Sequence, residues 1–314
     1  MNETEVKREI FDFPIERLPS YVNVGGTQVK TKRDCIVRTD TKKIIGYVSA
    51  ETIEKVNRLN GTIENVNRGY YKVVPHMELV TEARQAIGEL GVVPKETSYM
   101  LHEGGRLYHQ FDFPGETIAP VPNDLVSMRL TLVNSYDLSR PCGWELGGLR
   151  LVCTNGLVAF KRAFFEMRKH AGSFSMDHTI KNLKNAIITF KGDMRDYYAQ
   201  LADTDIATST GTEVITEMVH KGYMPEKYGK LIEEVWEHPE RANSVIPEVD
   251  SKGKAIEGSY VTVMEDVSLD KARNLWTLYN AFTLILTHYI VSIEVRMKLH
   301  AIVQTKLNAM VKGR

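Results

Sequence analysis

Apolar and polar residues alternate through much of the first half of the chain, which is the pattern of strands that bury one face. Two such runs, CIVRTD and IIGYVS, surround a short polar turn between Val29 and Ser49 and predict a hairpin. Further alternating runs follow in SYMLHEGGRLYHQFDFP, DLVSMRLTLVNSYDLS and GGLRLVCTNG. Together these runs predict an antiparallel sheet of about four to six strands.

Helical spacing of apolar residues first appears after Pro75, where HMELVTEARQAIGEL predicts a helix that ends at Gly88 or Gly91. A second helix is predicted from the apolar residues Leu157, Phe160, Phe164, Met167 and Ala171. A third is predicted to begin near Ser175 and to keep Leu201 on its buried side.

The chain from Asp203 to Asp250 is polar and acidic, with short helices predicted over Thr212–Val219 and Glu226–Glu237. The segment PEVDSKGKAIEGS is predicted to be a mobile loop. Ser268 is expected to cap a helix that runs without Gly or Pro from Leu269 to Val311.

These elements indicate an α+β fold, with an antiparallel sheet packed with helices in the N-terminal half and a helical C-terminal half with a long terminal helix. We expect residues 1–200 to form an α+β core with the sheet and basic helices. Residues 201–314 are expected to form a mainly helical region that contains the acidic segment and the long helix.

Composition excludes several classes of protein. The 314 residues include 40 Lys and Arg against 40 Asp and Glu, so no overall field attracts nucleic acid or a membrane. Three cysteines without a CxxC spacing argue against a disulfide framework and a thiolate zinc site. The charged N-terminus does not fit a signal peptide, and the apolar stretch from Ala281 to Ile293 is too short to span a bilayer. A cytoplasmic setting without membrane contact is expected.

Local charge is strongly asymmetric. Residues 150–191 hold eight Lys or Arg and two acids, whereas residues 193–250 hold five Lys or Arg and thirteen acids. In the predicted helix after Gly156, one sector gathers an aromatic ring and four cations, namely Lys161, Arg162, Phe165, Arg168 and Lys169. Cations beside a ring suit single-stranded nucleic acid, although a solvated charged face would show the same pattern.

Motifs for other chemistry are weak. The sequence has no GxxxxGK[ST] loop for nucleotide triphosphates and no HExxH pair for zinc, and no cofactor is expected. The strand-end residues Asp112, Asp124 and Asp137 are candidate ligands of a metal-dependent nuclease. In NSYDLSRPCGWELGG, two readings stay open: Asn134, Ser135 and Asp137 as turn formers, or Tyr136, Arg140 and Trp144 as the lining of a ligand groove.

A family resemblance is carried by seven segments in order: RTDTKKIIGYVS, YYKVVPHMELVTEA, GGRLYHQFDFP, LTLVNSYDLSRP, GGLRLVCTNGLVAF, RKHAG and LWTLYNAFTLILTH. Across residues 30–290 the chain resembles a family of phage and plasmid-like proteins filed as domain of unknown function 932. In outline it is also similar to the ring-forming, ATP-independent single-strand annealing recombinases of phages.

The resemblance implies a homo-oligomer, as a ring or filament, that binds and anneals single-stranded DNA in the cytoplasm of a bacterial host. On this view Lys161, Arg162, Arg168 and Lys169 hold phosphates, and Lys181, Lys184, Arg150 and Arg129 form a second tier. Phe165 and Tyr136 are then the candidates for stacking on bases. A metal-dependent nuclease and a phage assembly or interaction protein remain the alternatives.

Overall fold

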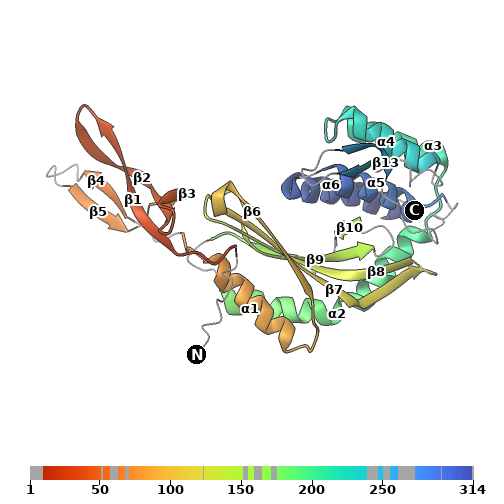
Figure 1. Ribbon diagram of the computed structural model, residues 1–314, viewed down its shortest axis with the longest axis horizontal. Helices are drawn as coiled ribbons and strands as arrows, with labels where there is room; N and C mark the ends of the chain where they lie inside the picture. Colours follow the sequence, from red (N-terminus) through yellow and green to blue (C-terminus); the bar gives the residue numbers. More distant parts are fainter. Residues whose placement is uncertain are drawn as a thin grey trace. The chain divides into compact units, whose positions relative to one another are not determined.

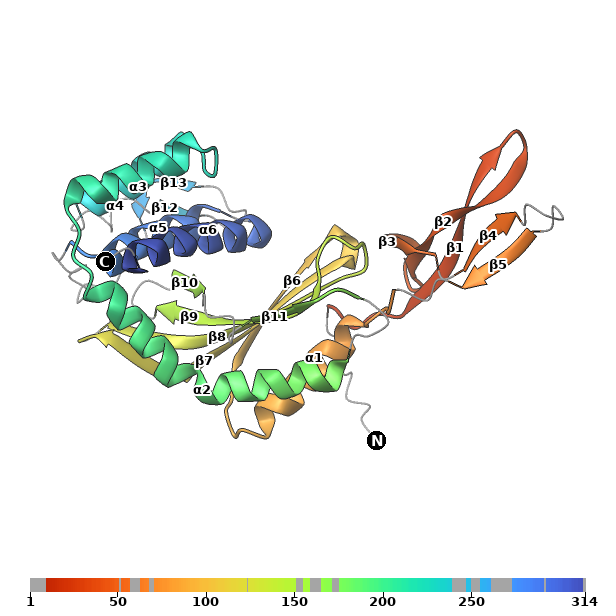
Figure 2. The same cartoon turned by 180° about the vertical axis from the view of Figure 1, so that it is seen from behind.

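The computed structural model describes residues 10–50, 52–56, 63–67, 71–122, 124–150, 155–158, 165–170, 175–238, 247–249, 255–260, 273–290 and 292–312. Within them the chain is α+β, as the sequence predicts, with antiparallel sheets and six helices (Figures 1 and 2). No helix in this part of the chain is long and apolar enough to cross a membrane.

The chain forms two compact units. Unit 1 comprises residues 1–111, 130–145 and 165–185, and unit 2 comprises residues 112–129, 146–164 and 186–314. Both units are therefore discontinuous in sequence. The expected division into an α+β core over residues 1–200 and a mainly helical region over residues 201–314 stays a prediction.

The predicted N-terminal hairpin is confirmed within a three-stranded sheet of unit 1, which consists of β1 (Ile15–Val24), β2 (Thr27–Arg38) and β3 (Lys43–Ser49). Its inner face packs in a core cluster, where Ile36 and Val48 meet Tyr71 and Tyr136. A separate two-stranded sheet follows, formed by β4 (Thr52–Val56) and β5 (Ile63–Asn67).

The main sheet contains β6 (Lys95–Leu101), β7 (Arg106–Val121), β8 (Asp124–Ser135), β9 (Cys142–Arg150), β10 (Asn155–Val158) and β11 (Phe165–Arg168). Its order is β10-β9-β8-β7-β6, and β11 also pairs with β9. The six strands agree with the predicted number. A short 3-10 turn over His102–Gly104 joins β6 to β7 at the Gly-Gly pair.

Four predicted helices are confirmed as α1 (His76–Gly88), α2 (Met176–Ala202), α3 (Thr208–His220) and α4 (Glu226–Glu237). Each has one buried face, because its apolar residues recur with the period of a helix. The segment predicted as a mobile loop instead contains two paired strands, β12 (Pro247–Val249) and β13 (Ala255–Tyr260).

The helix predicted to run unbroken from Leu269 to Val311 is wrong, and Ser268, its predicted cap, lies outside the described residues. The chain forms α5 (Leu275–Tyr289) and α6 (Ile293–Lys312), with Ile290 in an extended conformation between them. Ser292 then caps α6, since its hydroxyl accepts the Val295 N–H at 3.4 Å. The break lets α6 pack back onto α5 and bury apolar residues that a straight helix would expose.

The predicted helix over residues 157–171 is also wrong, because residues 155–158 and 165–168 are strands. Both strands pair with β9, which supplies hydrogen-bond partners that local sequence does not reveal. Gly143 permits the close approach of β11, since a Cβ atom there would lie 1.8 Å from the carbonyl oxygen of Glu166. Tertiary pairing thus overrides the helical spacing of the apolar residues.

Candidate functional site

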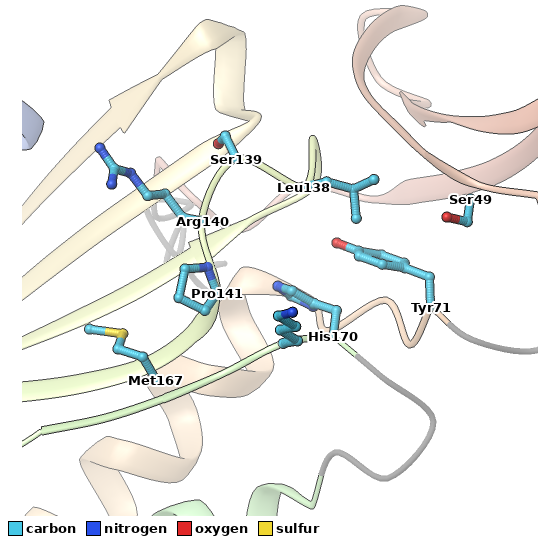
Figure 3. Close-up of a pocket in the computed structure, with 9 residues that line it drawn as sticks. Ser49, Tyr71, Leu138, Ser139, Arg140, Pro141, Met167 and His170 are labelled. Carbon is cyan, nitrogen blue, oxygen red and sulfur yellow. The ribbon is translucent and has the colours of Figure 1, made fainter.

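A cavity of about 520 Å³ opens in unit 1. It is lined by residues from four separate segments, which are Ser49, Tyr71, Leu138, Ser139, Arg140, Pro141, Met167, Lys169 and His170 (Figure 3). None of these nine residues is acidic, and two carry a permanent positive charge. The lining combines apolar surface with a few polar groups, as is typical of ligand pockets.

One wall is an aromatic pair. The rings of Tyr71 and His170 stack with their centroids 4.8 Å apart. Figure 3 shows the two side chains next to each other. The Tyr71 hydroxyl donates to the carbonyl of Ser135 at 3.0 Å. His170 Nδ1 donates to the carbonyl of Lys72 at 3.1 Å, and the Lys72 N–H donates to the carbonyl of His170 at 3.1 Å. These bonds fix both rings in place.

The opposite wall is the turn after β8. The Ser135 hydroxyl donates to the Arg140 carbonyl at 2.8 Å and accepts the Arg140 N–H at 3.1 Å. Asp137 accepts the Ser139 N–H at 3.0 Å and the Arg106 Nε–H at 2.8 Å. Burial acts to raise the pKa of Asp137, but these hydrogen bonds outweigh it and hold the pKa below its usual value. The turn-forming role predicted for Ser135 and Asp137 is confirmed, whereas that of Asn134 is wrong, because its Nδ2 donates to the Val74 carbonyl of a distant segment at 2.8 Å.

The turn is tied to α1 by a buried polar cluster. The His76 N–H donates to the Tyr136 hydroxyl at 2.7 Å, and the two rings stack with centroids 4.0 Å apart. His76 Nε2 lies 2.9 Å from the Gly104 carbonyl, and Asn134 Nδ2 lies 2.9 Å from His76 Nδ1. Burial lowers the pKa of His76 to about 3, so its ring is neutral at physiological pH.

Tyr136 is therefore not a stacking platform. It is 1% exposed, and its hydroxyl and ring are both engaged by His76. Trp144 is buried as well and donates from Nε1 to the Thr179 carbonyl at 3.0 Å. Of the three residues considered for a ligand groove, only Arg140 lines the cavity.

The predicted cations do not form one helical ridge. Lys161 and Arg162 lie outside the described residues, and only the backbone of Phe165 and Arg150 is described, in β11 and at the end of β9. Arg129 belongs to unit 2, where it pairs with Asp112 through two bonds, one of 2.8 Å from Nη2. That pairing compensates its charge within the fold.

The other four cations lie in unit 1, at the end of β11, directly after it and on α2, and are named here the basic strip: Arg168, Lys169, Lys181 and Lys184. Glu166 of β11 accepts hydrogen bonds from Asn182 of α2 at 2.5 Å and from Thr179 at 3.4 Å, which holds the two elements together. Lys169 and Lys181 are exposed. Arg168 pairs with Glu166, and Lys184 pairs with Glu89.

The three aspartates proposed for a nuclease are not assembled. Asp112 is paired with Arg129, and Asp137 is engaged in its own turn. Asp124 is buried and accepts the Trp276 Nε1–H at 2.8 Å. In the part of the chain that the structure describes, no three His, Cys, Asp or Glu residues are grouped to hold a metal ion.

Sequence reasoning missed most of the cavity. Tyr71 and His170 are separated by 98 intervening residues, so no local pattern brings them together. The sequence predicts that Leu138 and Pro141 lie in a turn and that Met167 lies in a helix. The RKH run at residues 168–170 and Arg140, one of the three residues considered for a ligand groove, pointed to this place.

Comparison with known proteins gives a family but no characterised relative. The family model described as Domain of unknown function (DUF932) matches residues 65–306. No curated protein and no solved structure matches the chain.

Proposed function

We infer that this chain, which belongs to the family described as Domain of unknown function (DUF932), binds single-stranded DNA as a homo-oligomer and anneals complementary strands without ATP. A phage or mobile-element origin and action in the cytoplasm of a bacterial host are parts of the same proposal. The observation that carries it is the basic strip, in which Glu166 holds β11 against α2 and four predicted phosphate ligands share one region of unit 1.

Two cations of the basic strip are paired with carboxylates, but these ion pairs do not prevent the strip from binding phosphates. The side chains of Lys184 and Glu89 are 31% and 51% exposed, so this pair contributes only about 0–1 kcal/mol and a phosphate group can replace the carboxylate at small cost. In the Arg168–Glu166 pair the arginine side chain is 43% exposed and the glutamate side chain 11%, so the arginine is the partner that faces solvent. Lys169 and Lys181 add two exposed cations, and phosphate contacts dominate the affinity of such surfaces.

The test is fluorescence anisotropy with a labelled 40-nucleotide single strand at several salt concentrations. We expect binding that weakens steeply as the salt concentration rises. In the Lys169→Gln/Lys181→Gln double variant, the slope of log association constant against log salt concentration should become less negative by about 1.4. The control is Lys230→Gln, at an exposed lysine of unit 2 that pairs with Glu226. No binding at low salt, or an unchanged slope in the double variant, would contradict the proposal.

A second candidate, an assembly protein without DNA activity, is favoured by the outer face of the β1–β3 sheet. Leu18, Cys35 and Tyr47 lie side by side across the three strands, and Leu18 and Tyr47 are 37% and 43% exposed. Mass photometry with and without the 40-mer separates the two functions. An oligomer that takes up no strand would identify the assembly protein, whereas uptake of the strand would exclude it.

A further inference from the structure

We propose that the cavity of unit 1 holds one nucleotide of a bound strand, with its base between the Tyr71–His170 wall and the Pro141–Met167 side, and with Lys169 and Arg140 at its phosphates. This assignment rests on the proposed function and names what occupies the cavity. Cations and aromatic rings, which the sequence pattern predicts on one helix, are instead found together in the lining of this cavity.

The size and the apolar lining of the cavity suit a nucleotide. A cavity of about 520 Å³ falls within the range that admits small ligands. Leu138, Pro141 and Met167 supply apolar surface of the kind that packs against a planar base, and the methionine thioether makes favourable contacts with aromatic rings. Figure 3 shows the Leu138 side chain directed toward Tyr71, and Pro141 and Met167 on the other side of His170.

The charge of the lining selects an anion. Lys169 enters from the end of β11 and Arg140 from the turn after β8, so the two cations come from different segments. In Figure 3 the Arg140 guanidinium points away from the Tyr71–His170 pair. A nucleotide chain carries a phosphate on each side of a base, so it can contact cations that come from two different segments.

The aromatic wall is preorganised and uncharged. The pKa of His170 is lowered, because burial disfavours its protonated form more than the bond to the Lys72 carbonyl favours it. A neutral ring stacked on Tyr71 keeps the wall apolar at physiological pH. Because hydrogen bonds to Ser135 and Lys72 already hold both rings, a ligand meets a wall that needs little ordering on binding.

The first experiment measures binding of thymidine monophosphate, thymidine and inorganic phosphate to the full chain by calorimetry. We expect the nucleotide to bind at least about tenfold more tightly than either part, since only it uses both the apolar walls and the cations. Arg140→Gln and Lys169→Gln should each weaken the nucleotide at least about fivefold. Lys230→Gln, at an exposed lysine of unit 2 outside both the cavity lining and the basic strip, is the matched control and should leave nucleotide affinity unchanged.

The second experiment irradiates a 40-mer that carries 5-iodouracil and maps the crosslinked peptides. Crosslinks at Tyr71, Met167 or His170 support the proposal. Strand binding without them, combined with no nucleotide binding, overturns the cavity assignment and leaves the proposed function standing. Nucleotide binding without strand binding overturns the proposed function and supports the cavity as a nucleotide site.

One further outcome decides the ligand class, and one control checks that the variants are folded. Inorganic phosphate that binds as tightly as the nucleotide would overturn the assignment, because the apolar walls would then contribute nothing. Urea unfolding of each variant shows whether it is folded. If Arg140→Gln is destabilised, Lys169→Gln carries the test, since its side chain is exposed.

Discussion

The imidazole of His76 lies flat against the phenol ring of Tyr136, with ring centroids 4.0 Å apart, and its backbone N–H donates to the Tyr136 hydroxyl. This contact joins the first residue of α1 to the turn that forms one wall of the cavity. A residue expected on sequence grounds to stack on DNA bases is thus a fixed part of the core.

Tyr136→Phe tests this structural role. The change keeps the ring but leaves the buried His76 N–H without its acceptor, so we expect unfolding free energy to fall by about 1–3 kcal/mol. Urea denaturation measures the loss. Strand affinity should stay at the wild-type value, and a variant that is equally stable but binds DNA poorly would restore Tyr136 as a stacking residue. Tyr47→Phe, at an exposed tyrosine, is the control and should change stability by less than about 0.5 kcal/mol.

Gly143→Ala tests the position of β11. A Cβ atom would lie 1.8 Å from the Glu166 carbonyl oxygen, so the backbone must move, and a loss of about 1–3 kcal/mol or more is expected. Hydrogen exchange should show faster exchange of the β11 amides. Gly192→Ala is the matched control, because no atom lies within 4 Å of its Cβ and alanine favours a helix. Equal stability of the two variants would contradict the pairing of β11 with β9.

Glu145 gives stability a dependence on pH. Burial raises the pKa of this β9 carboxyl to about 7, above its unfolded value of 4.5. The protonated form is therefore favoured in the fold, and its contribution is present below about pH 4.5 and lost as pH rises through 7. Glu145→Gln should stabilise the protein by about 1–3 kcal/mol at pH 8 and much less at pH 5. Urea unfolding at both values measures this, and an equal effect at the two would refute the buried carboxyl.

His300 produces the opposite dependence. It is buried in α6, and neither ring nitrogen has a hydrogen-bond partner among the residues that the structure describes. Burial together with the charges of Arg296 and Arg129 lowers its pKa to about 3. Its folded pKa lies below the unfolded 6.5, so stability is present above 6.5 and lost as pH falls toward 3.

We therefore expect His300→Leu to stabilise the protein by about 1–3 kcal/mol at pH 7, because it removes an unsatisfied buried polar group. The gain should increase at pH 5, as measured by urea unfolding. His220→Leu, at an exposed histidine, serves as the comparison and should change stability by less than about 0.5 kcal/mol. A loss of stability in His300→Leu would show that the ring makes polar contacts that matter.

Several elements could be predicted from local pattern. The hairpin of β2 and β3 follows from alternation around a polar turn, and α1, α3 and α4 follow from apolar residues at helical spacing. Residues 157–171 could not be assigned in this way, since their apolar residues fit a helix while the backbone of residues 155–158 and 165–168 pairs with β9. Gly143, the glycine that admits β11, lies 23 positions before Glu166, whose carbonyl oxygen it approaches, and no sequence feature near Glu166 indicates this contact.

The sequence by itself determined the α+β class, most helices and the local excess of cations after the central strands, because periodicity and charge are properties of neighbouring residues. Only the tertiary structure decided that Tyr136 is buried, that β11 joins the sheet, and that Tyr71 stacks on His170 beside Lys169. Each of these depends on contacts between distant segments, whose free energy comes from burial and backbone pairing that no single stretch of chain can express alone.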